Sequence, residues 1–255
     1  MNRHDITYGP EPDQHIQCHA PSGTTTSKGL AILVHGGYWR SRFTASLMDA
    51  MVSDLLDGGW AVANVEYRRG SENSTWPEPA EDVALAIETL ANSQWAGGPR
   101  IAIGHSVGGQ LALLANAGVD AVVALAPLTD ITRTRAEGLG DGAVSEYFGN
   151  AEPATYRGAS PIHQLPLTAP VLVVHGVQDD RVPVEHSRDF VAAALAARSE
   201  IEIQEHAAMD HIGAIDPKLG HWAGVLEWMD ARTRACNSAN PAASGNSRGQ
   251  AAAFV

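Results

Sequence analysis

The segment from Arg100 to Ala115 places a serine between two glycines, with an apolar run on either side. The run 101–103 has the composition of a short buried strand, and residues 110–115 have that of an apolar helix. Between them, Gly104-His105-Ser106-Val107-Gly108 matches the Gly-x-Ser-x-Gly pattern of a sharp strand-to-helix turn, where the serine is strained and the glycines leave room for the crossing backbone. This context predicts that Ser106 is a nucleophile.

Apolar runs of strand length alternate with helical patterns along the rest of the chain. The predicted strands are 29–34, 60–65, 101–104, 120–126, 170–174 and 200–205, with an edge strand near 14–19. The predicted helices are 43–56, 81–90, 110–115, 184–197 and 217–232. Right-handed crossovers in this order give an α/β fold, with a mostly parallel central sheet and helices on both faces. Ligands of such sheets bind beyond the carboxyl ends of the strands.

The length and composition of the chain fit one large domain. With 255 residues, of which 44% are hydrophobic, it can bury a proper core, and we expect one domain over residues 1–236. Residues 128–170 break the strand-helix pattern and predict a small irregular, lid-like insertion. The polar tail, residues 237–255, is predicted to be disordered.

Charge and cysteine content narrow the range of partners. The formal net charge of −12, without any basic cluster, argues against nucleic acid and anionic membranes, and favours a small-molecule substrate. No leader-like or membrane-spanning run is seen, and the two cysteines lie far apart, so a cytoplasmic protein without disulfides is expected. The 11 histidines show no metal-ligand spacing, and we expect neither metal nor cofactor. A monomer and a homodimer are not distinguished.

A serine nucleophile needs a histidine base, and the base needs a carboxylate that fixes its tautomer. Folds with this turn carry them in the order serine, acid, histidine. Asp179, in the loop after the strand 170–174, is the predicted acid, and His211, after the last strand, is the predicted base.

Each assignment has an alternative that the sequence leaves open. Asp180, next to the predicted acid, and Asp130, after the preceding strand, could serve as the acid. His206 could serve as the base, although it belongs to the end of the strand. His35, His105 and His175 are expected to be structural groups that bond the loop backbone around the site.

Attack on a carbonyl creates an oxyanion, which backbone N–H groups commonly stabilise. One N–H is expected from Val107, the residue after the nucleophile. Others are expected from the glycine-rich turn His35-Gly36-Gly37-Tyr38, where glycine lets the backbone approach a substrate.

With these residues in place, the chain over residues 10–235 resembles an α/β-hydrolase. His35-Gly36-Gly37-Tyr38-Trp39 is similar to the HGGxW turn of kynurenine formamidase (arylformamidase) and related small esterases. The serine turn, the start of the helix after Trp76-Pro77, and Asp210-His211-Ile212 also resemble that branch. The resemblance implies that the oxyanion donors are the N–H groups of Gly37, Tyr38 and Val107.

The expected activity is that of a serine hydrolase that cleaves a small carboxylic ester or amide through an acyl-enzyme on Ser106. An aryl-formamide such as N-formyl-kynurenine is the specific case that the resemblance implies. A lactonase, thioesterase or exopeptidase on the same fold, or a non-catalytic binding protein, is the alternative. The aromatic residues expected to line the substrate pocket are Trp39, Trp76, Tyr147 and Phe148.

Overall fold

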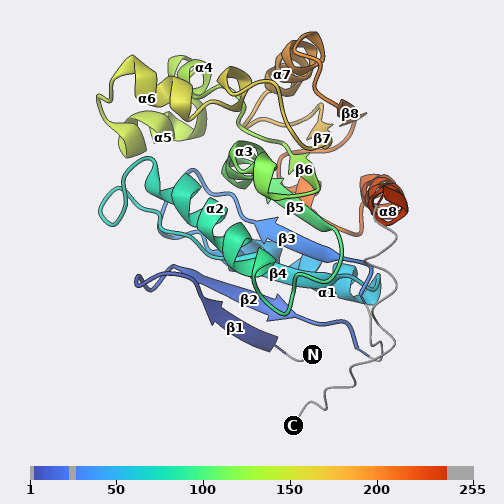
Figure 1. Cartoon of the computed structure of the whole chain (residues 1–255). Helices are drawn as coiled ribbons and strands as arrows, with labels where there is room; N and C mark the ends of the chain where they lie inside the picture. The colour runs from blue at the N-terminus through green and yellow to red at the C-terminus, as the bar shows by residue number, and fades with distance from the viewer. Residues whose placement is uncertain (1–2, 23–26, 240–255) are drawn as a thin grey trace.

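A computed structural model describes residues 3–22 and 27–239 and shows one mixed sheet covered by helices (Figure 1). Within these residues the sheet has eight strands in the order β1-β2-β4-β3-β5-β6-β7-β8. The strands β3 to β8 are parallel, while β1 and β2 form an antiparallel edge. Their bounds are β1 Arg3–Thr7, β2 His15–His19, β3 Leu30–Val34, β4 Ala61–Val65, β5 Arg100–His105, β6 Ala121–Leu125, β7 Val171–Gly176 and β8 Ile201–His206.

The buried strands confirm the sequence prediction. Every residue of β3, β4 and β6 is buried, as expected of strands covered on both faces. The strand β1 was not predicted, because its residues are exposed or half-buried and show no apolar alternation. It forms by pairing with β2, where Ile6 lies opposite Ile16.

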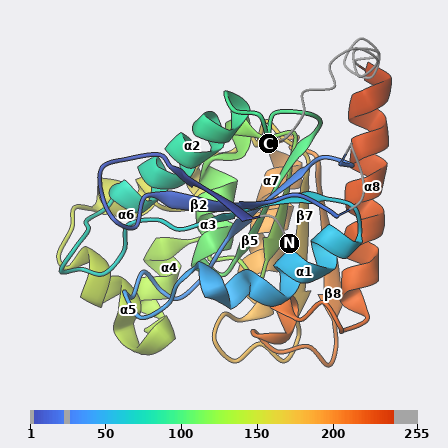
Figure 2. The same ribbon diagram turned by 90° about the horizontal axis from the view of Figure 1, so that it is seen from below.

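Helices cover both faces of the sheet (Figure 2). One face packs against α2 (Glu78–Ala91), α3 (Val107–Leu114) and α7 (Val184–Ala196), through residues such as Val83, Leu111 and Phe190. The other packs against α1 (Asp49–Asp57) and α8 (His221–Ala239), through Met51 and Val225. Short 3-10 turns complete the chain at Ala45–Met48, Asn116–Gly118, Pro161–His163 and Gly213–Ile215.

The last helix runs further than the sequence predicted. It continues to Ala239, three residues into the segment expected to be disordered, and residues 240–255 of that segment lie outside the described residues. None of the described helices has both the length and the apolar character needed to cross a membrane.

The insertion 128–170 contains three short helices joined by loops, whereas the sequence predicted an irregular segment. It forms α4 (Ile131–Ala136), α5 (Leu139–Phe148) and α6 (Pro153–Gly158), which Figure 1 shows as one group to one side of the sheet. These helices are too short to show a clear apolar period. Gly138, Gly140 and Gly142 also have φ of 65°, 66° and 76°, so left-handed backbone interrupts the pattern.

Candidate active site

Ser106 sits on a tight turn between β5 and α3. Its backbone has φ 56° and ψ −117°, a conformation that residues other than glycine rarely adopt. The Ser106 N–H donates to the carbonyl of Leu125 at 2.8 Å, and the Ser106 carbonyl accepts from the N–H of Gln110 at 3.1 Å. These bonds hold the serine in a strained position at the carboxyl end of the sheet.

The flanking glycines allow two backbone segments to touch at this turn. A Cβ atom on Gly104 would lie 2.2 Å from the carbonyl oxygen of Gly108. A Cβ atom on Gly108 would lie 2.0 Å from the carbonyl oxygen of Val34 in β3. Any larger side chain at either position would therefore separate α3 from the strands.

Asp179 and His211 meet in the loops that follow β7 and β8. Asp179 Oδ2 accepts a hydrogen bond from His211 Nδ1 at 2.7 Å, and Asp179 Oδ1 accepts from the N–H groups of Val182 at 2.8 Å and Arg181 at 2.9 Å. Since the carboxylate accepts from Nδ1, the other ring nitrogen, Nε2, is left free to take a proton.

His175 also binds the carboxylate of Asp179. Its Nε2 donates to Asp179 Oδ2 at 3.1 Å and to the carbonyl of Val182 at 2.9 Å, while Ser187 Oγ lies 2.7 Å from its Nδ1. Burial alone would raise the pKa of Asp179, but the hydrogen bonds from His175 and His211 hold that pKa well below its usual range. Asp179 is thus a buried carboxylate that remains ionised.

The alternatives left open by the sequence lie elsewhere. Asp180 is exposed at the cavity wall. Asp130 caps α4, where its Oδ1 accepts from the N–H of Arg133 at 3.0 Å. His206 packs its ring against His221, with 5.5 Å between the centroids. The geometry therefore pairs Asp179 with His211 and not with these residues.

Ser106 and His211 line one cavity of about 440 Å³. The cavity is also bordered by Tyr38 from the turn after β3 and by Leu139 and Asp141 from the insertion. No hydrogen bond joins the two described side chains Ser106 and His211, and such bonds often tighten only when substrate is bound. Across residues 3–22 and 27–239, no cluster of three or more histidine, cysteine or acidic side chains is placed to hold a metal ion.

The segment from His35 to Trp39, here called the glycine turn, lies against the serine. A Cβ atom on Gly36 would come within 3.0 Å of the Ser106 Cβ. Gly37, Tyr38 and Trp39 have φ of 122°, 50° and 56°, three positive values in succession. The turn therefore presents its backbone to the cavity in a conformation that costs free energy.

The proposed oxyanion donors lie in the glycine turn, at the cavity, and directly after Ser106 in the chain. Gly37 and Tyr38 line the cavity, and Val107 is the first residue of α3, whose N–H has no partner within the helix. The Tyr38 hydroxyl donates to the carbonyl of Arg181 at 3.0 Å, which ties the glycine turn to the loop of Asp179. Burial, followed by the nearby Asp179 charge, raises the pKa of Tyr38 to about 12, so this hydroxyl stays protonated at neutral pH.

His105 holds the backbone of His211. Its Nε2 donates to the His211 carbonyl at 3.0 Å, and the two rings lie 4.7 Å apart. Burial, and then the proximity of His211, lowers the pKa of His105 to about 3, so this ring is neutral near pH 7. His105 has the structural role expected from the sequence.

The four aromatic residues expected in the pocket form a packed cluster instead. Trp39 stacks on Tyr147 with centroids 5.4 Å apart, and Phe148 packs against Trp39 at 5.2 Å and against Trp76 at 5.5 Å. In the described chain none of the four borders the cavity of Ser106, although Trp39 and Tyr147 border a separate one of about 130 Å³. Aromatic composition near a predicted loop did not indicate which way these rings point.

The charged lining of the cavity was not predicted, although Asp180 had been named as a possible acid. The charged residues that line the cavity are Arg40, Arg42, Asp141, Asp180 and Arg181. Arg40 pairs with Glu146 at 2.7 Å, whereas Arg42 and Arg181 are exposed. Position alone could have suggested Arg181, because it follows the predicted acid by two residues. No comparable signal marks Asp141, which lies in the short helices of the insertion.

Among proteins of known sequence, esterase LipC of Mycobacterium tuberculosis is 30% identical over 241 residues, which cover 83% of this chain and 60% of LipC. Esterase LipQ of the same organism is 29% identical and matches 64% of this chain and 45% of its own. The chain therefore spans about half the length of these relatives.

Solved esterases share the fold. A truncated carbohydrate esterase from gut microbiota superposes with a TM-score of 0.80 at 17% identity, over 90% of this chain and 95% of that one. Esterase B from Lactobacillus rhamnosis gives 0.79 at 16% identity, over 94% and 89%. These likenesses show the α/β-hydrolase fold, and the expectation of that fold is confirmed.

A family model covers most of the chain. The prolyl oligopeptidase family matches residues 59–234, which run from the start of β4 into α8 and include the serine turn, Asp179 and His211. With this match, the parallel sheet and the serine at the end of β5, the chain belongs to the prolyl oligopeptidase family of α/β-hydrolases.

Proposed function

We propose that the protein is a serine hydrolase that cleaves a small carboxylic ester or amide through an acyl-enzyme on Ser106. The observation that carries the proposal is the buried Asp179–His211 pair, joined at 2.7 Å, whose histidine lines the same cavity as the strained serine. Three strand ends bring a serine, a histidine and a carboxylate to the same region of the sheet, and a hydrolase needs this combination. The esterase names of the matched relatives support the same class of reaction.

In this mechanism His211 Nε2 takes the proton of the Ser106 hydroxyl as Oγ attacks the substrate carbonyl. The N–H groups of Tyr38 and Val107, with that of Gly37, stabilise the oxyanion. His211 then protonates the leaving alcohol or amine, and the carbonyl carbon remains bonded to Oγ. Water, deprotonated by His211, hydrolyses this acyl-enzyme and restores the serine. Asp179 stays ionised throughout and stabilises the imidazolium.

An aryl-formamide with an amino-acid side group, such as N-formyl-kynurenine, is the finer proposal. The glycine turn that resembles kynurenine formamidase supports it, and so do the charges of the cavity. Arg42 and Arg181 could receive a carboxylate, and Asp141 and Asp180 an ammonium group. Short esters, lactones and thioesters lack this pair of charges and would gain nothing from these residues.

The test is turnover of N-formyl-kynurenine beside p-nitrophenyl acetate and p-nitrophenyl butyrate, for the wild type and Ser106→Ala. We expect kcat to fall by about 10⁶-fold in the variant. Efficient cleavage of the formamide supports the finer proposal, whereas cleavage of the short esters alone would leave a carboxylesterase. Matched lactone, thioester and peptide substrates separate the other hydrolases. If a fluorophosphonate does not label Ser106 in the folded protein, the serine hydrolase proposal is wrong.

A further inference from the structure

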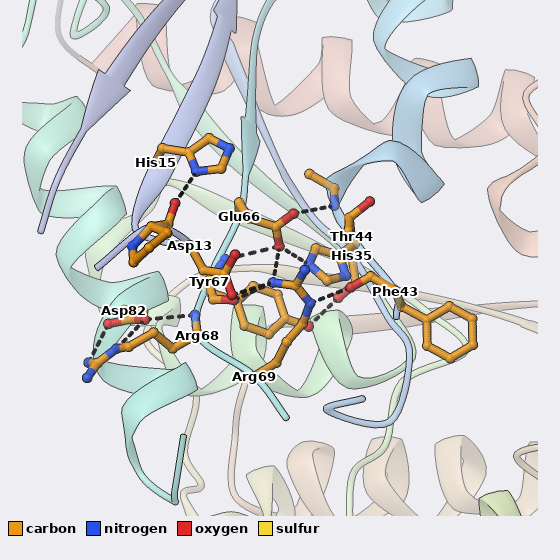
Figure 3. A network of polar contacts seen from close by, with 12 residues as sticks. Asp13, His15, His35, Phe43, Thr44, Glu66, Tyr67, Arg68, Arg69 and Asp82 are labelled. Atoms are coloured by element: carbon orange, nitrogen blue, oxygen red, sulfur yellow. Dashed lines mark hydrogen bonds and ion pairs between the residues drawn. The ribbon is translucent and has the colours of Figure 1, made fainter. Parts of the chain in front are cut away.

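Glu66 is a buried carboxylate at the end of β4 that the mechanism above does not use. It is 4% exposed and lies inside a network of polar contacts beneath the glycine turn (Figure 3). Its two oxygens accept hydrogen bonds from His35 Nε2 at 2.8 Å, from the N–H of Ala45 at 3.0 Å and from the N–H of Tyr67 at 3.3 Å. It also forms an ion pair with Arg69 at 2.7 Å.

These partners lie on both sides of the glycine turn. His35 is its first residue, and Ala45 begins the 3-10 turn that follows it. Burial would raise the pKa of Glu66, but the hydrogen bond from His35 and the charges of His35 and Arg69 hold the pKa below its usual range. One ionised side chain therefore connects the two ends of the segment that carries the turn.

Neighbouring residues reinforce the same two ends. The Tyr67 hydroxyl donates to the carbonyl of His35 at 2.8 Å, and the two rings stack with centroids 4.4 Å apart. On the far side, Arg69 Nε donates to the carbonyl of Phe43, and Asn64 Nδ2 donates to the carbonyl of Ala45 at 2.9 Å. The anchors all come from β4 and the residues directly after it.

The part of the turn between these anchors is strained. Gly37, Tyr38 and Trp39 have positive φ in succession, a region of backbone conformation that is unfavourable for residues other than glycine. Such a conformation persists only where the surroundings hold it in place. The anchors at Glu66 supply that constraint on both sides of the backbone that lines the cavity.

A second buried carboxylate nearby provides a comparison. Asp82 is 1% exposed and pairs with Arg68 at 2.7 Å (Figure 3). It also accepts from Gln14 Nε2 at 2.7 Å. It makes no hydrogen bond or ion pair with any residue of the segment 35–45, all of which is described. The two carboxylates match in burial and in pairing with arginine, but only Glu66 reaches the turn.

We infer that Glu66 is a positioning residue, which holds the backbone N–H of Tyr38 where the oxyanion forms. The inference rests on the proposed serine hydrolase function. Glu66 does not touch the substrate, and its effect appears in the transition state, where the negative charge develops, more than in substrate binding.

The test compares Glu66→Gln and Arg69→Lys with the control Asp82→Asn, on the best substrate found for the wild type. The glutamine keeps the size of the side chain, but an NH2 group, which cannot accept a hydrogen bond, replaces one of the two accepting oxygens. We expect kcat to fall about 10–100-fold with KM little changed. The inhibition constant of a trifluoromethyl ketone, which forms a tetrahedral oxyanion on Ser106, should rise by the same factor. Asp82→Asn should lose stability but keep its kcat.

Each outcome decides the inference. An unchanged kcat in folded Glu66→Gln, or an equal fall in Asp82→Asn, would overturn it while Ser106→Ala remained inactive. If Glu66→Gln does not fold, the kcat of Arg69→Lys, which loses the Nε donor to Phe43, is the deciding measurement, and the same fall is expected. Should both fail to fold while Asp82→Asn folds, the network serves global stability and the inference is wrong. Failure of the proposed function differs, because Ser106→Ala would then retain the wild-type activity.

Discussion

Replacing Gly108 by alanine tests the backbone contact beneath Ser106, the proposed nucleophile. The new Cβ would lie 2.0 Å from the carbonyl oxygen of Val34 and 2.5 Å from that of His35. The distance between a carbon and an oxygen atom in contact is normally about 3.3 Å. Both neighbours are backbone atoms, which cannot rotate away, so α3 and β3 must separate by about 1 Å.

The expected cost follows from this overlap. Overpacking a core by one methyl group lowers the free energy of unfolding by about 1–3 kcal/mol. Because the neighbours on both sides are rigid, we expect this substitution to cost about 3 kcal/mol. In a chain of this length each kcal/mol lowers the melting temperature by about 2–4 °C, which gives a decrease of about 6–12 °C. The shift also displaces Ser106 and the N–H of Val107, and a displacement of about 1 Å can reduce kcat by about 10²-fold.

The measurement is thermal unfolding followed by circular dichroism, together with ester hydrolysis. Gly109→Ala is the graded comparison, since its Cβ would meet Pro127 Cβ at 2.9 Å and should cost less. Gly158→Ala, at the end of α6, meets no atom within 4 Å and should leave stability equal or slightly higher. If Gly108→Ala unfolded at the wild-type temperature with full activity, the close crossing of α3 over β3 would be refuted.

Three further predictions concern the site and its surroundings. Asp179→Asn should lower kcat by about 10⁴-fold, because the amide would favour the wrong tautomer of His211; steady-state kinetics measures this, and a kcat within tenfold of wild type would contradict it. His105 has a folded pKa of about 3, below its unfolded value of about 6.5, so its contribution to stability is complete above about pH 6.5 and falls by up to about 1.4 kcal/mol per pH unit towards pH 3. Urea unfolding between pH 4 and 7 measures how the free energy of unfolding changes with pH. This free energy should rise less steeply with pH in His105→Gln than in the wild type, and equal slopes would refute the lowered pKa of His105. Phe148→Ala should cost about 3–5 kcal/mol of stability and leave KM unchanged, because this ring packs in the aromatic cluster; a rise in KM would place it in the pocket.

The parts of this molecule that could be predicted are those that local sequence determines. A buried parallel strand is a continuous apolar run, so the strands from β3 to β7 were visible without any knowledge of their partners. The strand β8 was predicted from alternation instead, with Ile201 and Ile203 on one face. The serine turn was equally local, since Gly104 and Gly108 flank Ser106 within five residues. The choice of Asp179 and His211 used only chain order and loop position, and the structure brings these two side chains into contact.

The parts that were missed depend on contacts between distant segments. β1 is polar and forms only because β2 offers a partner. The direction in which Trp39 points depends on Tyr147 and Phe148, more than 100 residues later. Glu66 follows a buried strand, where a carboxylate could as well have faced solvent, and its partner His35 lies 31 residues earlier.

The insertion between β6 and β7 forms one wall of the cavity and carries none of the three proposed catalytic residues. Gly138, Leu139, Gly140 and Asp141 of this segment contribute to the cavity wall, whereas Ser106, Asp179 and His211 come from the ends of sheet strands. Mutation within residues 128–170 can thus change one wall of the cavity without altering the strand ends that carry Ser106, Asp179 and His211. A library confined to residues 128–170 would therefore vary this wall of the cavity, while the walls formed by residues 37–47 and 180–215 stay unchanged.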